Sequence, residues 1–166
     1  MKLTSQEEYG LRCLLQLAQA PEGFGTIHTI AEREGLTPAY VAKLLGVLKR
    51  AQLVHATRGH NGGYQLARPA EAIDLSEVLT ALGGRIYSPA FCQAHAGGEA
   101  ECRHNNNCSI RPVLVGLDRL VHEALSMISL KSLVRSEPAM QGWLKLRIHG
   151  PEQDAFLAPI PVKGKA

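Results

Sequence analysis

Two consecutive helical patterns and the hairpin pattern behind them place the strongest constraint on the fold of this chain. Between Thr26 and Leu53, apolar residues recur at the spacing of the inner faces of two helices. Gly35 permits a tight turn between these helices. Thr37 is a suitable N-cap and Pro38 suits the first helical position, so the second helix is predicted over residues 38–51. The arrangement indicates a helix-turn-helix.

The segment VHATRGHNGGYQLAR, residues 54–68, follows at once and alternates between apolar and polar residues on both sides of His60-Asn61-Gly62-Gly63. Asn-Gly supplies the positive φ angles that a tight hairpin turn requires. A hairpin directly after a helix-turn-helix is typical of a wing. We therefore predict a mainly α fold with a small β-wing, in which a winged helix-turn-helix domain precedes a long dimerisation helix.

The charge of this region points to nucleic acid. Residues 36–68 carry five Lys or Arg and two His but no Asp or Glu, although the net charge of the chain is only +3. Any one basic residue is ordinarily part of a solvated surface, but an acid-free run on these elements favours contact with DNA in its grooves and with phosphate. The expected DNA contacts are Thr37, Pro38, Ala39, Tyr40, Lys43, Lys49, Arg50, Arg58, His60 and Asn61.

The N-terminal residues predict a further helix over 5–20, because a capping-box pattern begins at Thr4 and apolar residues then recur at helical spacing. Cys13 lies beside this apolar stripe, so we interpret it as a small core residue and not as a ligand. Glu8 lies on the opposite side of the helix. Its ordinary role there is an ion pair with Arg12, four residues further on.

The chain beyond the wing continues with a short helix over 75–82, which Gly83 and Gly84 end. Pro112 opens the longest amphipathic segment, and its broad apolar stripe predicts packing against a second copy through residues 111–127. Prolines after Arg135 are expected to break any regular element. The predicted units are a winged domain (1–84), a cysteine-rich cluster-binding loop (85–110), a dimerisation helix with a short closing helix (111–134) and a flexible C-terminal tail (135–166).

Three of the four cysteines lie in one loop, residues 91–111, that has almost no apolar content. Cys92, Cys102 and Cys108 are separated by nine and then five residues, and the Gly and Asn residues between them allow the chain to bend back on itself. The three sulfurs could then converge. Thiolates suit zinc or an iron–sulfur cluster and do not suit calcium or magnesium. Ordinary loop thiols, or a disulfide between two of them, are the alternatives.

Length, composition and the absence of certain motifs limit the other classes of protein to which this chain could belong. A chain of 166 residues with 45% hydrophobic content can form one domain with a real core. No run approaches the roughly 18 apolar residues of a membrane span, and no leader pattern is present, so we expect a soluble protein in a reducing cytoplasm. An enzyme is not expected, because the sequence has no phosphate-binding glycine loop and no specific pairing of a nucleophile with a base.

Several of these patterns together resemble the Rrf-two family of bacterial winged-helix regulators, which includes IscR-, NsrR- and RirA-like proteins. The resemblance covers residues 1–134 and is carried by MKLTSQEEYGLR, the helix pair IAEREGLTPAYVAKLLGVLKRAQLV, the cysteine loop and the long helix. Its most specific part is the wing, RGHNGGYQLARP. It implies a cytoplasmic dimer, associated with the nucleoid when bound to DNA, in which loop cysteines hold an iron–sulfur cluster that controls operator binding.

The resemblance also implies a ligand set for a cluster of two or four irons. Cys92, Cys102 and Cys108 correspond to its cysteine ligands. Arg111 stands where IscR-like members have a histidine, and Arg12 stands where a redox-sensing two-iron variant has one. Glu8, donated by the first helix of the partner subunit, is therefore the preferred fourth ligand, as in NsrR-like members. His104 and His95 are the local alternatives.

The resulting hypothesis is a repressor whose dimer reads the half-sites of a palindromic operator on double-stranded DNA. Its affinity would depend on cluster status and so respond to nitric oxide, redox state or iron supply. A regulator of the same fold that uses zinc or a thiol switch is the nearest alternative. A cluster carrier without an operator is a third hypothesis, which leaves the basic wing without a role.

Overall fold

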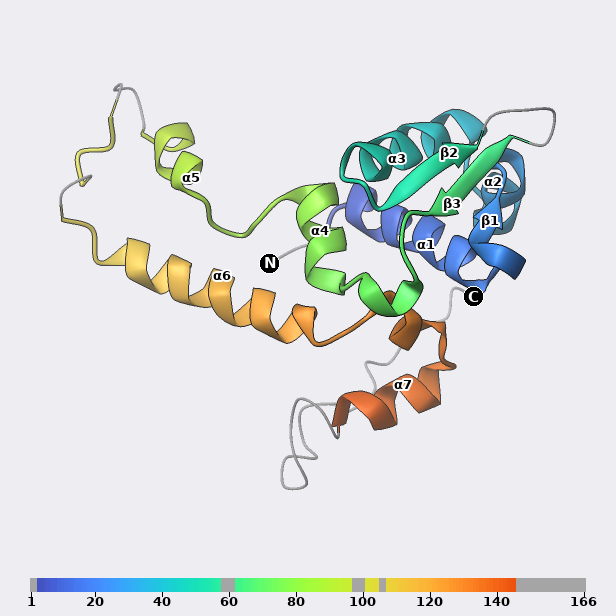
Figure 1. Cartoon of the computed structure of the whole chain (residues 1–166). Coiled ribbons are helices and arrows are strands. Elements are labelled where there is room, and N and C mark those ends of the chain that lie inside the picture. The colour runs from blue at the N-terminus through green and yellow to red at the C-terminus, as the bar shows by residue number, and fades with distance from the viewer. Residues whose placement is uncertain (1–2, 58–61, 97–100, 105–106, 146–166) are drawn as a thin grey trace, which may run out of the picture.

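The computed structural model describes residues 3–57, 62–96, 101–104 and 107–145. Most of the described chain is helical, and a three-stranded antiparallel sheet of strand order β1-β3-β2 completes it. The predicted fold class is thereby confirmed. Figure 1 shows two parts: a head, residues 3–84, and an arm, residues 85–127, that extends away from it. The head contains α1 Ser5–Gln19, α2 Ile27–Glu34, α3 Pro38–Arg50, α4 Leu75–Gly83, β1 Phe24–Gly25, β2 Val54–Thr57 and β3 Gly63–Leu66.

Local capping signals begin the helices of the head where the sequence predicts them. The Thr4 hydroxyl accepts a hydrogen bond from the amide of Glu7, and the Glu7 carboxylate accepts one from the amide of Thr4 at 2.7 Å. The Thr37 hydroxyl caps α3 in the same way, with Pro38 in the first turn. Gly35 ends α2 in the left-handed region, with φ of 65°, which a residue with a Cβ adopts only under strain.

The core of the head lies where α1 packs against α3 and α4. Its fully buried side chains are mostly leucines, and Cys13 is among them with 0% exposure, which confirms its predicted place in the core. The contact between α1 and α4 is close at Gly10, where an added Cβ would clash with the side chain of Leu82. A larger residue at this position would therefore force Leu82 to move within a packed core.

The wing joins β2 and β3, with Val54 opposite Leu66 and Thr57 opposite Gly63. The two strands confirm the predicted hairpin on either side of its turn. Three of the expected DNA contacts, Arg58, His60 and Asn61, lie outside the described residues.

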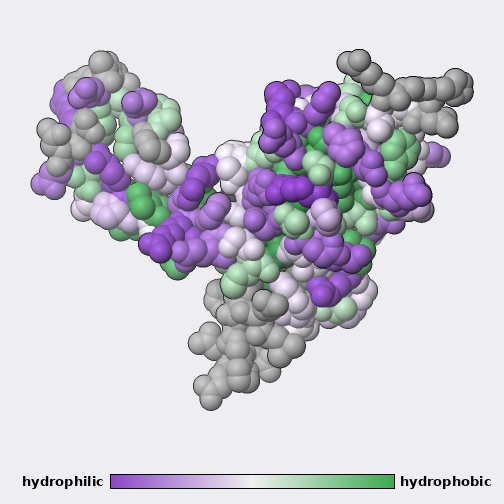
Figure 2. Space-filling model, viewed as in Figure 1, coloured by the Kyte–Doolittle hydropathy of each residue, from purple (hydrophilic) through white to green (hydrophobic). Residues whose placement is uncertain are grey.

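The arm consists of α5 Pro89–Ala94 and α6 Ile110–Ser126, with the cysteine-rich segment between them. The chain then returns to the head through the 3-10 helix η3 Leu130–Val134, where the amide of Leu130 donates to the carbonyl of Ile73 at 2.8 Å. In Figure 2 the arm stands out from the head and carries hydrophobic residues among hydrophilic ones. Two short 3-10 helices, η1 Pro21–Gly23 and η2 Ala70–Ala72, complete the described elements before α7.

Two expectations about local structure are wrong. Cys92 lies on a short helix, α5, and not in an irregular loop. The prolines after Arg135 do not break every regular element, because α7 spans Glu137–Leu144. Pro138 occupies the first turn of α7, where the helix makes no use of the missing N–H. Residues 146–166 of the predicted tail lie outside the described residues.

Candidate nucleic-acid interface and cysteine site

The outward face of α3 carries most of the described residues predicted to contact DNA. Thr37, Pro38 and Ala39 are exposed at its first turn, and Lys43, Lys49 and Arg50 are exposed further along it. The two last residues add positive charge at the end of α3. The structure therefore places these six residues on one accessible helix, as the helix-turn-helix pattern predicts.

A cleft of about 450 Å³ lies beside the first turn of α3. It is bounded by the first turn of α2, with Thr26 and His28, and by the wing strands at Thr57 and Tyr64. Thr26 and His28 are not among the DNA contacts predicted from the sequence. Both could have been identified from the sequence, because they flank the N-terminus of the helix that packs beside α3, the predicted recognition helix.

Tyr40 differs from its expected position. It is half-buried, and its ring meets the ring of Tyr9 edge-on, with centroids 6.1 Å apart and planes at 79°. The contact fastens the first turn of α3 to α1. Tyr40 therefore supports the recognition helix from inside, whereas its place on the outward face was the expectation.

Arg12 connects the predicted ligand Glu8 with the helix-turn-helix. Its guanidinium lies 2.7 Å from Oε1 of Glu8, as the spacing of four residues predicts, and 3.9 Å from Oε2 of Glu34 on α2. It also lies 5.3 Å from the ring centroid of Tyr9. Arg12 thus contacts Glu8 and Tyr9 on α1 and Glu34 on α2.

Cys92, on α5, has polar neighbours from the segment before α5 and from the start of α6. Its Sγ is 3.4 Å from the hydroxyl of Tyr87, and the guanidinium of Arg111 also forms a hydrogen bond with it. The hydrogen bond from Tyr87, and then the hydrogen bond and positive charge of Arg111, lower the pKa of Cys92. Cys108 is close enough for its charge to act on Tyr87 and Arg111. Neither Tyr87 nor Arg111 is among the site residues predicted from the sequence, where Arg111 only occupies the position of a histidine in IscR-like members.

The three arm cysteines are all free and partly buried. Their thiols are chemically suited to bind an iron–sulfur cluster or zinc. Within the described part of one chain, however, no three His, Cys, Asp or Glu side chains lie close enough together to hold a metal ion. The ligand set Cys92, Cys102, Cys108 and Glu8 therefore stays a prediction, and a complete site would have to draw on a second chain or on a rearranged loop.

The two alternative ligands lie in the same arm. The ring of His95 stacks on that of Phe91 at a centroid distance of 4.1 Å, and its Nδ1 lies 2.8 Å from the Phe91 carbonyl. The carbonyl of His104 accepts a hydrogen bond from the amide of Asn107. His95 would have to give up its contacts with Phe91 to bind a metal through Nδ1, whereas its Nε2 is not involved in that bond.

Comparison with known proteins decides the family. The Rrf2 family, described as iron-dependent transcriptional regulators, matches residues 3–136. The chain belongs to the Rrf2 family. It is 34% identical to the ORF2 protein of Azotobacter vinelandii over 167 residues, covering 99% of this chain and 96% of that protein. It is 30% identical to the HTH-type transcriptional regulator IscR of Xenorhabdus nematophila, covering 84% and 83%. It resembles the solved structure of CymR, the global cysteine regulator of B. subtilis, with 26% identity, a TM-score of 0.61 and coverage of 81% and 96%.

Rrf2 membership explains the exposed recognition helix and wing. The protein is an HTH-type transcriptional regulator that binds DNA, and its relatives are regulators and not enzymes. Among the described helices of this Rrf2 protein, none has the length and apolar content to cross a membrane.

Proposed function

We propose that this Rrf2 protein is a homodimeric, cytoplasmic repressor whose operator affinity is controlled by an iron–sulfur cluster held in the arm. The observation that carries the proposal is the contrast among the cysteines. All four cysteines are free thiols, but Cys13 is fully buried in the core, whereas Cys92, Cys102 and Cys108 are only partly buried and lie in one segment of the arm. Similarity to an IscR regulator and to a family described as iron-dependent supports iron as the metal.

Exposed apolar residues on α6 support the dimer. Four of them recur at helical spacing on one side of the helix, and each is roughly half exposed or more. They are Ile110, Val113, Leu117 and Leu120. The other side of α6, with Asp118 and Leu125, faces α4. A second copy of α6 would cover the exposed stripe, since a soluble chain rarely leaves such a face in water.

Glu8 is the proposed ligand from the partner subunit. It is 51% exposed in its side chain and is held by Arg12, so ligation would compete with that ion pair. Arg12 keeps Glu34 and Tyr9 as neighbours when Glu8 leaves. A bound cluster would restrain the arm of one subunit relative to α1 of the other. This restraint would then depend on nitric oxide, redox state and iron supply, because each of them affects the cluster.

The consequence for DNA binding follows from the same contacts. Tyr9 and Arg12 connect α1 with Tyr40 on α3 and with Glu34 on α2, so the position of α1 affects the recognition helix. A coupling of about 1–3 kcal/mol between the two sites is typical and suffices for a switch of roughly five- to 150-fold. Two recognition helices would read the half-sites of a palindrome, with phosphate contacts from Lys43, Lys49, Arg50 and Arg58.

A second candidate is a thiol switch without a cluster, with zinc as a variant of it. The observation that favours it is the setting of Cys92, whose sulfur receives hydrogen bonds from Tyr87 and Arg111 and whose pKa is lowered by them. A thiol with this environment is more reactive at neutral pH.

The deciding experiment is anaerobic purification followed by visible absorption spectroscopy, with iron and sulfide assayed on the same sample. We expect a coloured protein with matching iron and sulfide. Cys92→Ala should lose both, whereas Cys13→Ala, which removes a cysteine outside the arm, should keep them. Colourless wild-type protein after reconstitution would refute the cluster and leave the zinc or thiol candidate.

Glu8 is tested by substitution to Gln, with Glu32→Gln as the control, because Glu32 is an exposed acid on the neighbouring α2. Glu8→Gln should leave a folded dimer that releases its iron faster and loses the cluster-dependent change in operator affinity, measured by fluorescence anisotropy at several salt concentrations. Equal iron retention in the two variants would remove Glu8 from the ligand set.

A further inference from the structure

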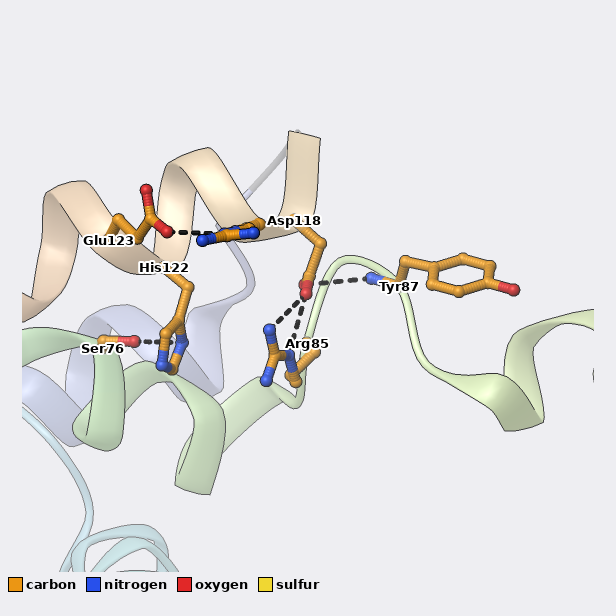
Figure 3. A network of polar contacts seen from close by, with 7 residues as sticks. Ser76, Arg85, Tyr87, Asp118, His122 and Glu123 are labelled. Carbon is orange, nitrogen blue, oxygen red and sulfur yellow. Dashed lines mark hydrogen bonds and ion pairs between the residues drawn. The ribbon is translucent and has the colours of Figure 1, made fainter. Parts of the chain in front are cut away.

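Asp118 is a nearly buried carboxylate on α6, with 7% exposure. Its Oδ2 accepts hydrogen bonds from Nε and Nη2 of Arg85 at 2.9 and 2.5 Å, and its Oδ1 accepts one from the backbone amide of Tyr87 at 3.2 Å. Figure 3 shows these bonds converging on Asp118 from the segment that follows α4. The hydrogen bonds from Arg85, joined by the one from Tyr87, lower the pKa of Asp118, so the carboxylate stays ionised at neutral pH.

The same segment leads directly to the cysteine site. Tyr87 has its amide bonded to Asp118, its ring 5.7 Å from that of Phe91 and its hydroxyl 3.4 Å from Sγ of Cys92. One residue is thus attached to α6 through its backbone and to α5 through its side chain. Because Arg85 and Asp118 are 33 positions apart in sequence, their bond fixes α5 relative to α6 in a way that local structure cannot.

The short helix α5 needs such support. It has six residues, and the side chain of its N-cap, Ser88, makes no capping hydrogen bond. A helix of this length is marginal by itself, so its place must come from tertiary contacts. The hydrogen bonds from Arg85 and Tyr87 to Asp118 are contacts of this kind, and the local ring contact between Tyr87 and Phe91 adds to them.

We propose that Asp118, Arg85 and Tyr87 are positioning residues of the cysteine site: the Arg85–Asp118 pair holds the segment before α5, and the Tyr87 hydroxyl, aimed by that pair, donates a hydrogen bond to the Cys92 sulfur. The inference rests on the proposed function in so far as that sulfur binds iron. Hydrogen bonds to ligand sulfurs tune the reduction potential of a cluster, and partners outside the ligand set fix ligand geometry.

The pair is tested first in metal-free protein, by hydrogen–deuterium exchange of the peptide covering residues 85–95. Asp118→Asn keeps the shape of the side chain and removes its charge. We expect exchange in this peptide to rise about tenfold, as in a segment that opens locally. Glu123→Gln is the matched control, because Glu123 lies on the same helix and its bond to Arg119, 2.7 Å long, is at the surface. Unchanged exchange in Asp118→Asn would overturn the proposal whether or not the protein binds iron.

Iron release to a chelator then shows whether the pair serves the site. We expect release from Asp118→Asn to be about 10- to 100-fold faster than from wild type, as when a partner of a metal ligand is removed, and release from Glu123→Gln to be unchanged. Thermal unfolding of each variant separates this effect from general destabilisation. Release equal to wild type, despite faster exchange, would overturn the positioning role.

Tyr87→Phe isolates the hydroxyl, with Tyr64→Phe on the wing as the control. The ring contact with Phe91 is kept, so the fold and iron content should not change. The midpoint potential of the bound cluster should move to a more negative value, because a hydrogen-bond donor to a ligand sulfur is lost. A potential equal to that of wild type would overturn the role of the hydroxyl. Wild-type protein that takes up no iron would refute the proposed function, and the exchange experiment would then decide the positioning of Cys92 by itself.

Discussion

Cys13 in the head and Cys92 in the arm show how differently the two regions treat the same side chain. Cys13 has 0% exposure among leucines, and burial raises its pKa to about 12. Cys92 is partly exposed between Tyr87 and Arg111, whose hydrogen bonds lower its pKa. The head therefore makes its thiol inert, whereas the arm keeps its thiol ready for chemistry.

The same contrast runs through the packing of each region. The head buries a continuous set of apolar side chains and so stabilises itself. In α6, all of whose residues the structure describes, only Asp118 is buried, and it is charged. The apolar residues Ile110, Val113, Leu117 and Leu120 are exposed. The arm therefore leaves much of its apolar surface available for a partner.

The largest expected effect is on thiol reactivity. In metal-free protein treated with iodoacetamide at pH 7.5, Cys92 should react more than about a thousandfold faster than Cys13, because a core thiol is exposed only when the head opens, at a cost of several kcal/mol. Mass spectrometry of timed samples resolves the two sites. Similar rates at Cys13 and Cys92 would mean that the head opens readily and that the contrast does not hold.

The next effect concerns the apolar stripe of α6. Leu120→Glu should weaken the proposed dimer by about 3 kcal/mol or more, since each copy would lose a leucine that the second copy covers, typically ~1.5–3 kcal/mol, and would gain a charge at the interface. Analytical ultracentrifugation measures the dissociation, and the thermal unfolding of the head should change little.

Val115→Glu is the matched control for Leu120→Glu. Val115 is also exposed, at 45%, but lies roughly 140° or more around the helix from Leu120 and Leu117. A dimer weakened equally by both substitutions would show that the stripe is not the interface, and an unchanged dimer in Leu120→Glu would remove α6 from it.

The smallest expected effect is on the free energy of unfolding. It is seen by substituting one glycine in the head, Gly10, and one in the arm, Gly116. Gly10→Ala should destabilise the protein by about 1–3 kcal/mol, the usual result of overpacking a well-filled core, because the new Cβ would clash with the side chain of Leu82. Within its own chain, an added Cβ at Gly116 in α6 would meet nothing within 4 Å, so the comparison is made on the monomeric protein. Gly116→Ala should stabilise the helix by roughly 0.5–1 kcal/mol. Urea unfolding measures both, and a neutral Gly10→Ala would show that the head is less tightly packed than its geometry indicates.

Much of the head could be predicted because its signals are local. Thr4, Thr37 and Gly35 act on backbone groups within a few residues, and apolar periodicity identifies the inner face of each helix. The bounds of α1 and α3 consequently lie within one residue of their predicted ends. The error at Pro138 has a local cause too, since a proline that ends one helix is equally suited to begin another.

The winged helix-turn-helix, the core position of Cys13 and the pairing of Glu8 with Arg12 could be predicted from the amino-acid sequence, because each depends on residues a few positions apart. The surroundings of Cys92 depend on the tertiary fold. Tyr87, Arg111 and the Arg85–Asp118 pair come together because α6 returns along α4, and no periodicity encodes a bond across 33 positions. Local hydrogen bonds form the elements, whereas burial of the face between α4 and α6 brings distant polar groups into contact.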